Sequence, residues 1–171
     1  MKKMQGNKGF TLIELLIVVA IIGIIAAIAV PGLLRARMSG NEASAIGSLR
    51  AVNSAQASYA AAAGSGGYAV LLATLATPCA GATQAFISPD LSIDPSMKSG
   101  FNVTLASATG VAGPNDCNGT ATETDYYAEA EPVDFGTTGN RSFNTDQAGT
   151  IFGLPAAAIA AGDMIVANAI Q

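Results

Sequence analysis

The sequence predicts an α+β fold, in which a long N-terminal helix packs its second half on a small antiparallel β-sheet. Three observations lead to this fold class. An apolar run extends from Phe10 to Val30 with a single charge, that of Glu14. A helical pattern then continues from residue 31 to about residue 63. Beyond it, short runs of β-branched or aromatic residues alternate with turn-forming residues, which is typical of strands joined by hairpins.

The apolar run follows a short basic leader, residues 1–9, and is long enough to cross a membrane. As a helix rising about 1.5 Å per residue, residues 10–30 extend about 31 Å, which matches the hydrocarbon core of a bilayer. A secretory signal has a shorter apolar core with its cleavage site behind it. A plain membrane anchor explains the length but not the acid. Because a carboxylate in lipid is costly, we expect Glu14 to have a partner.

The helix is predicted to kink and then to become amphipathic over residues 31–63. Pro31 removes one backbone hydrogen bond and clashes with the preceding turn, so a kink is expected near residues 27–32. Beyond it, Arg50, Ser54 and Ser58 lie opposite an apolar stripe suited to packing on a sheet. That stripe consists of Ala45, Leu49, Val52, Gln56, Tyr59 and Ala63. Residues 64–67, Gly-Ser-Gly-Gly, should end the helix.

Residues 64–171 are predicted to form a globular head with a C-terminal tail. Residues 68–76 indicate a short helix or turn, and three prolines indicate an irregular connector after it. The sheet should contain three to four antiparallel strands, formed by residues 101–106, 126–131, 141–145 and 150–152. Residues 136–140 and 146–149 are the expected hairpin connections. Residues 154–171 are small and apolar, and their pattern favours no single conformation.

Composition argues against nucleic-acid binding and against catalysis. The chain has 8 lysines and arginines, 12 acids and no histidine. From residue 51 onward only Lys98 and Arg141 oppose the acids, so the head alone has no basic face for phosphates. No acid–base or nucleophile–base pair is suggested by the sequence, so we predict that the protein is not an enzyme and needs no cofactor.

The two cysteines, Cys79 and Cys117, predict a disulfide in an oxidising compartment. Closing a loop of this size stabilises a fold by about 4 kcal/mol in the chain-entropy model. The alternative is a pair of free, buried thiols. Two cysteines without histidine make a poor zinc site, so no metal site is predicted from them.

Other patterns carry weaker predictions. The run Asp116-Cys117-Asn118-Gly119 resembles the start of a calcium loop, but its glycine comes too early and no glutamate closes it. The acids Asp125, Glu129, Glu131 and Asp134 are more typical of a solvated strand face than of a metal site. The glycosylation acceptor pattern occurs at Asn102, Asn118 and Asn140, and short patterns of this kind arise by chance.

The run Lys8-Gly9-Phe10-Thr11-Leu12-Ile13-Glu14, followed by an apolar stretch broken at Pro31, resembles the N-terminus of a type IV prepilin. The detailed resemblance covers roughly Lys8 to Tyr59. It implies that a membrane-embedded peptidase cuts between Gly9 and Phe10 and methylates the new amine of Phe10. It also implies that the helix between Gly23 and Pro31 loses its regular structure locally in a filament.

The resemblance implies a structural subunit of a type IV pilus-like surface filament. Its partners would be further copies in a helical filament, the prepilin peptidase and methyltransferase, an assembly platform in the inner membrane, and the bilayer before assembly. Glu14 lies one turn from the Phe10 amine of its own helix, so pairing within one subunit is one option. The other is pairing with the Phe10 amine of a staggered neighbouring subunit, which would set the axial register. The alternative is a glutamate that extends to the membrane surface without a role in assembly.

Two other functions stay open at this point. One is a pseudopilin of a type II secretion system. The major pseudopilins often carry a calcium site in this part of the head, and its ligand pattern is not legible here. The other is a single-span membrane protein with a small ligand-binding head.

Overall fold

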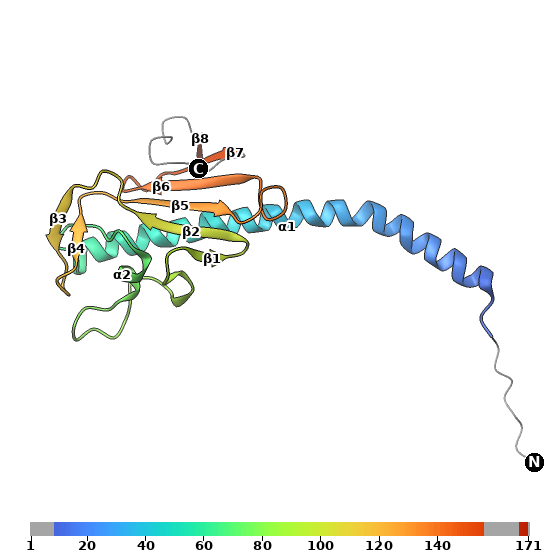
Figure 1. Ribbon diagram of the computed structural model, residues 1–171, viewed down its shortest axis with the longest axis horizontal. Helices are drawn as coiled ribbons and strands as arrows, with labels where there is room; N and C mark the ends of the chain where they lie inside the picture. The colour runs from blue at the N-terminus through green and yellow to red at the C-terminus, as the bar shows by residue number, and fades with distance from the viewer. Residues whose placement is uncertain (1–8, 156–167, 171) are drawn as a thin grey trace, which may run out of the picture. The chain divides into compact units, whose positions relative to one another are not determined.

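The computed structural model describes residues 9–155 and 168–170, and Figure 1 shows the order of their helices and strands. A long N-terminal helix is followed by short helical segments and antiparallel strands, which confirms the predicted α+β fold class. The chain divides into two compact units, residues 1–36 and residues 37–171, and each is described by itself.

The first unit contains the apolar part of helix α1, which as a whole runs from Leu12 to Ala62. Every described residue from Gly9 to Ala36 is exposed to solvent. By length and composition, α1 could cross a membrane. The helix is continuous through Pro31, so the kink and the local loss of helix between Gly23 and Pro31 stay predictions.

In the second unit, residues 37–62 of α1 pack on the sheet through the predicted apolar stripe. All six predicted stripe positions are buried, while Arg50, Ser54 and Ser58 are exposed. The helix ends as expected at the glycine-rich segment. The Gly64 N–H donates to the Tyr59 carbonyl (2.8 Å) and the Gly66 N–H to the Ala60 carbonyl (2.9 Å). Gly66 has a φ of +93°, a conformation that favours glycine.

The head contains one six-stranded antiparallel sheet and a separate two-stranded ribbon. The order of the strands in the sheet is β1-β2-β5-β6-β7-β8, and the ribbon pairs β3 with β4. Two short helical segments, α2 (Leu72–Ala76) and the 3₁₀ turn η1 (Pro89–Leu91), precede the strands. The strands are β1 (Ser96–Lys98), β2 (Phe101–Ala106), β3 (Ala112–Asn115), β4 (Ala121–Glu123), β5 (Tyr127–Pro132), β6 (Arg141–Asp146), β7 (Ile151–Pro155) and β8 (Asn168–Ile170).

The four predicted strands correspond to β2, β5, β6 and β7, but the expected number of strands was too small. Pairing adds β1 and β8 at the two edges and the β3–β4 ribbon. The segment Ser96–Lys98 contains no β-branched residue, and Ala112–Asn115 contains glycine and proline, so neither has a strand-like composition. These strands depend on their partners. Residues 156–167 and 171 of the predicted tail lie outside the described residues.

The hydrophobic core lies between the stripe of α1 and the inner face of the sheet. Phe101 of β2 and Phe143 of β6 are fully buried, and their ring centroids are 6.1 Å apart. They pack in one cluster with Leu49, Val52 and Tyr59 of the helix. Fully burying one large apolar side chain contributes about 1.5–3 kcal/mol. Burial of this cluster is therefore a large favourable contribution to the stability of the head.

An ion pair joins α1 to the start of β6. Glu42 is 8% exposed, and its Oε2 accepts hydrogen bonds from Arg141 Nη2 (2.7 Å) and Nε (2.9 Å). Its Oε1 accepts one from the Asn140 N–H (2.9 Å). Three charge-assisted bonds on one buried carboxylate fix the helix against the loop before β6.

Candidate functional site

The start of α1 brings the predicted cleavage junction and the lone acid together. Gly9, Phe10 and Thr11 precede the helix, and the Leu15 N–H donates to the Thr11 carbonyl (3.3 Å). The Glu14 N–H donates to Thr11 Oγ1 (3.3 Å). In return Glu14 Oε2 accepts from the Thr11 N–H (3.1 Å) and from Thr11 Oγ1 (2.7 Å). Thr11 and Glu14 thus form a reciprocal capping box.

The capping box gives Glu14 a role within its own helix, which the sequence analysis missed. The signal was present, because a threonine followed three residues later by glutamate is the pattern of this motif. The predicted cleavage between Gly9 and Phe10 would remove neither member of the pair, and Thr11 would keep its amide N–H. Within the part of the chain that the structure describes, Glu14 Oε1 accepts no hydrogen bond. One oxygen can therefore cap the helix while the other is available to a neighbour.

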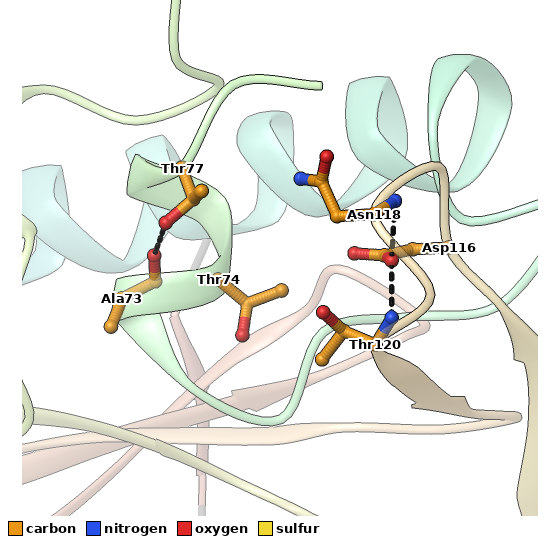
Figure 2. A pocket seen from close by; sticks show the side chains of 6 residues that line it. All are labelled: Ala73, Thr74, Thr77, Asp116, Asn118 and Thr120. Atoms are coloured by element: carbon orange, nitrogen blue, oxygen red, sulfur yellow. Dashed lines mark hydrogen bonds between the residues drawn. The ribbon is translucent and has the colours of Figure 1, made fainter. Parts of the chain in front are cut away.

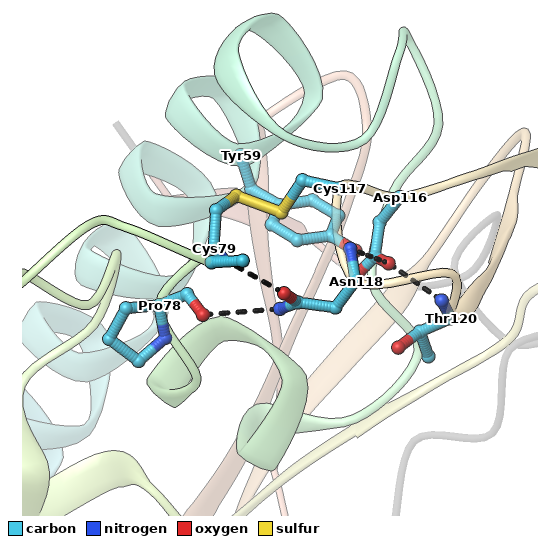
Figure 3. Close-up of a disulfide and its surroundings, with 8 residues drawn as sticks. Tyr59, Pro78, Cys79, Asp116, Cys117, Asn118 and Thr120 are labelled. Atoms are coloured by element: carbon cyan, nitrogen blue, oxygen red, sulfur yellow. Dashed lines mark hydrogen bonds between the residues drawn. A yellow bond between two sulfur atoms is a disulfide. The ribbon is translucent and has the colours of Figure 1, made fainter.

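The predicted disulfide is present in the head. Cys79 and Cys117 are bonded, with their Cα atoms 5.6 Å apart, and no described cysteine is free (Figure 3). The bond joins the segment after α2 to the turn between β3 and β4. The Cys117 N–H also donates to the carbonyl of Ala63, at the end of α1 (2.9 Å). Helix end, connector and ribbon are thus held at one corner of the head.

Asn118 adds hydrogen bonds beside the disulfide. Its Nδ2 donates to the Pro78 carbonyl (3.1 Å), and its Oδ1 accepts from the Ala80 N–H (3.2 Å), as Figure 3 shows. These two bonds join the same two segments as the disulfide does. The Asn118 side chain is therefore already hydrogen-bonded to the backbone on either side of Cys79.

Asp116 connects this corner to the core. It is 8% exposed, and its Oδ2 accepts from the Tyr59 hydroxyl (2.8 Å). Its Oδ1 accepts from the N–H groups of Asn118 (2.9 Å) and Thr120 (2.6 Å). Burial acts to raise the pKa of Asp116, but these hydrogen bonds outweigh it and lower that pKa. Burial, together with Asp116, raises the pKa of Tyr59. Both carboxylate oxygens are thus occupied by internal donors.

A shallow cavity of about 220 Å³ lies next to Asp116 (Figure 2). It is lined by Ala73, Thr74, Thr77, Asp116, Asn118 and Thr120. The Thr77 hydroxyl donates to the carbonyl of Ala73 (2.8 Å), and Asp116 and Asn118 are engaged as described. The polar groups of this cavity are largely satisfied within the head, so its lining offers little chemistry for a ligand.

The structure separates the four acids that the sequence grouped together. Asp125 is buried and accepts hydrogen bonds from the Thr109 N–H (3.1 Å) and hydroxyl. Asp134 is exposed in the loop after β5. Glu129 and Glu131 are half-buried on one face of β5 rather than fully solvated. Among the described residues, no three His, Cys, Asp or Glu side chains gather as a metal site.

We expect Asp116→Ala to lower the free energy of unfolding by about 2–4 kcal/mol, because it leaves Tyr59 and two backbone N–H groups without an acceptor. Tyr59→Phe, which removes only one of these bonds, should cost about 1 kcal/mol. The pKa of Asp116 is lowered in the fold, so its stabilisation is present above the unfolded pKa and lost as the pH falls through the folded pKa.

Chemical denaturation of both variants measures these differences. Asp134→Ala is the matched control, because it removes an exposed acid and should change stability by less than about 0.5 kcal/mol. Equal stabilities of the Asp116 and Asp134 variants would show that the Asp116 bonds do not support the head.

Comparison with known proteins places the N-terminal segment in a family. The family model of the prokaryotic N-terminal methylation motif matches residues 4–30. The type IV major pilin protein PilA of Myxococcus xanthus is 51% identical over 53 residues, which are 31% of this chain and 24% of that protein. The N-terminal segment is similar to that of type IV pilins. The predicted resemblance to the N-terminus of a type IV prepilin is thereby confirmed.

Two further relatives match shorter stretches of the chain. The type IV wide pilus major component PilA4 of Thermus thermophilus is 62% identical over 39 residues, or 23% of this chain and 30% of that protein. A fimbrial protein of Pseudomonas aeruginosa is 79% identical over 28 residues, or 16% and 18% of the two chains. The matches span less than a third of these curated relatives. No solved structure matches the chain.

Proposed function

We propose that this protein is a structural subunit of a type IV pilus-like surface filament. The precursor crosses the inner membrane once, is cut between Gly9 and Phe10, is methylated on the Phe10 amine, and then assembles through residues 10–30. One observation carries the proposal: the apolar first part of α1 is exposed along its whole length and begins at a capping box that contains its lone acid. Among the described residues of the first unit, no other segment covers the helix.

The exposed surface of this helix explains why it needs other copies or lipid. The large apolar side chains of Phe10 and of the helix up to Leu34 are between 49% and 83% exposed. Such a continuous apolar surface is not stable in water. Transfer of the helix from the bilayer into a filament gains little hydrophobic free energy, because lipid tails are as apolar as leucine side chains. Assembly therefore depends on close packing and on satisfying the few polar groups, of which Glu14 is one.

The partners follow from this mechanism. The motif over residues 4–30 supports processing by a prepilin peptidase and methyltransferase, and the apolar helix supports residence in the bilayer before assembly. Further copies of the chain, brought together by an assembly platform in the inner membrane, would cover the helix. We propose no nucleic-acid partner for the head alone. Its cationic side chains Lys98 and Arg141 both form ion pairs with acids and so are not free to bind phosphates.

Glu14 is proposed to set the axial register of the filament. Cleavage creates a positive amine on Phe10 in surroundings that become apolar once the helices pack. An unpaired charge there costs several kcal/mol, and a close ion pair offsets much of that cost. Glu14 Oε2 is held by Thr11, so Oε1 is the oxygen available to the Phe10 amine of a staggered neighbour. The contact forms only at the correct axial offset.

A pilus is favoured over the two other functions. The relatives are named as pilus or fimbrial components, which supports a pilus rather than a type II secretion pseudopilus. Internal donors also occupy both oxygens of Asp116, where a calcium loop was considered. A ligand-binding head gains no support from the cavity beside Asp116.

The mass of the mature subunit tests the processing step. Subunits from sheared surface filaments should have the mass of residues 10–171 plus one methyl group and minus the two hydrogens of the disulfide. Intact-mass and N-terminal fragment spectra measure both. Gly9→Val is the matched control, since a side chain at Gly9 meets nothing within 4 Å in the fold. It should accumulate as uncut precursor in the membrane. A mature N-terminus beyond Ala20 would overturn the proposal.

A further inference from the structure

A cluster of polar side chains lies on the outer face of the sheet, opposite the core. The outer-face cluster consists of Asn102 and Thr104 on β2, Glu129 and Glu131 on β5, and Ser142 and Asn144 on β6. Strand register places Asn102 opposite Glu131, Thr104 opposite Glu129, and Glu129 opposite Asn144. Continuing the last register by two residues, past Ala130 opposite Phe143, places Ser142 opposite Glu131. Six polar residues thus form two adjacent rows across three strands.

Apolar side chains close one side of the outer-face cluster. On β7, Leu154 lies opposite Ser142, and Phe152 lies opposite Asn144. Both Ser142 and Asn144 are 0% exposed, although they are on the face of the sheet that does not contact α1. The two glutamates beside them are half-buried. The part of the cluster at Ser142 and Asn144 is therefore shielded from water, and an unpaired polar group is costly there.

Half of the outer-face cluster is satisfied internally. Glu129 Oε1 accepts from the Thr104 hydroxyl (3.2 Å), and its Oε2 accepts from the Tyr127 hydroxyl (3.1 Å). Asn144 Nδ2 donates to the Tyr127 oxygen (3.5 Å). Since the amide nitrogen of Asn144 faces Tyr127, its oxygen lies on the other side of the amide. The hydroxyl groups of Thr104 and Tyr127 and the amide N–H of Asn144 are thus all used around Glu129 and Tyr127. None of them donates to the remaining oxygens of the cluster.

The other half consists of three buried oxygens without a partner. Glu131 Oε1, Ser142 Oγ and Asn144 Oδ1 have no hydrogen-bond partner among the described residues. A buried acceptor without a donor costs about 1–3 kcal/mol, and a charged one costs more. Each such group in a native fold needs an explanation, such as a bound ion or water.

Charge decides between an ion and water. Glu129 and Glu131 carry two negative charges two residues apart on one strand face. From residue 51 onward the sequence has only two cationic side chains. Lys98 pairs with Asp90, and Arg141 with Glu42. A water molecule would supply hydrogen bonds but no positive charge.

We propose that the outer-face cluster binds a hard divalent cation such as Ca²⁺, with Glu131 Oε1, Ser142 Oγ and Asn144 Oδ1 as ligands and Glu129 as the second negative charge. Carboxylate, amide and hydroxyl oxygens, completed by water, are the ligands that Ca²⁺ takes in proteins. With three protein ligands the site belongs with the weak extracellular sites, whose dissociation constants are about 10⁻⁴–10⁻³ M. It is separate from the turn around Asp116, and it does not depend on the proposed function.

The full-length chain in detergent micelles provides the test, with Ca²⁺ and Tb³⁺ as the probes. At a Ca²⁺ concentration about tenfold above the dissociation constant, the Tm should exceed its value in EDTA by about 3–5 °C. Tb³⁺ bound beside Glu129 should show luminescence sensitised by Tyr127, whose hydroxyl contacts that carboxylate. Excess Ca²⁺ should displace it.

Two variants separate this site from other acids of the head. Glu131→Gln should lose the Ca²⁺-dependent rise in Tm. In EDTA it should be at least as stable as the wild type, because its amide replaces a buried charge with a donor. Asp134→Asn removes the same charge outside the cluster and should keep the full response to Ca²⁺. The proposal is overturned if Ca²⁺ does not change the wild-type Tm, or if Glu131→Gln responds as the wild type does.

Discussion

Glu14→Ala is expected to abolish filament assembly while leaving export, cleavage and insertion in the membrane intact. The substitution leaves the Phe10 amine without a counter-charge in the packed filament, and an unpaired charge there costs several kcal/mol. A loss of only about 1.4 kcal/mol per contact reduces association tenfold. Counting surface filaments by electron microscopy in a strain without any wild-type copy measures the effect. Normal filament numbers would refute the register role of Glu14.

The capping box makes a sharper set of variants possible. Glu14→Gln keeps an acceptor for the Thr11 N–H and hydroxyl, because glutamine also serves at this position of a capping box, but it removes the charge. Thr11→Ala keeps the charge and removes the cap, at about 1 kcal/mol of helix stability. If pairing with a neighbour dominates, Glu14→Gln fails to assemble and Thr11→Ala assembles. The opposite result would assign Glu14 to the cap alone.

Glu14→Asp tests the reach of the carboxylate. The charge is retained, but the side chain is shorter by one methylene group, so the neighbouring amine is reached less well. We expect partial assembly, between that of the wild type and that of Glu14→Ala. Both the number and the length of the filaments should show it.

Cys79→Ser is expected to destabilise the head by about 4 kcal/mol, since the disulfide closes a loop of 38 residues. The bond also holds the β3–β4 turn close to Ala63 at the end of α1, so its loss loosens the corner that contains Asp116. Filament yield should fall, while cleavage after Gly9 should be unaffected. Denaturant unfolding of the full chain and the mass of its N-terminal fragment measure the two effects.

Cys117→Ser and the double variant should match Cys79→Ser, because each removes the same bond. Asn118→Ala is the matched control. It removes two hydrogen bonds between the same segments but leaves the covalent link, and should cost about 1–2 kcal/mol. Labelling of both cysteines by a thiol reagent in native filaments would contradict the prediction.

The structure of the N-terminal helix could be predicted from local sequence patterns. The continuous apolar run and the apolar stripe at helical spacing are patterns of residues close together in the sequence. Composition and periodicity therefore predict α1 and its buried positions. The capping box of Thr11 and Glu14 is local too, and the pattern alone could have predicted it. The four central strands were also predicted, because β-branched and aromatic residues between turns carry a period of two.

Only the tertiary structure decided which weak segments pair and which polar groups are buried together. The edge strand β1 and the ribbon strand β3 lack strand-like composition and form because a neighbouring strand offers them hydrogen bonds. Glu42 and Arg141, like Tyr59 and Asp116, meet across long stretches of chain. Ser142 and Glu131 become neighbours through strand register. No local pattern encodes such pairs, because each depends on contacts that exist only once the sheet has folded on the helix.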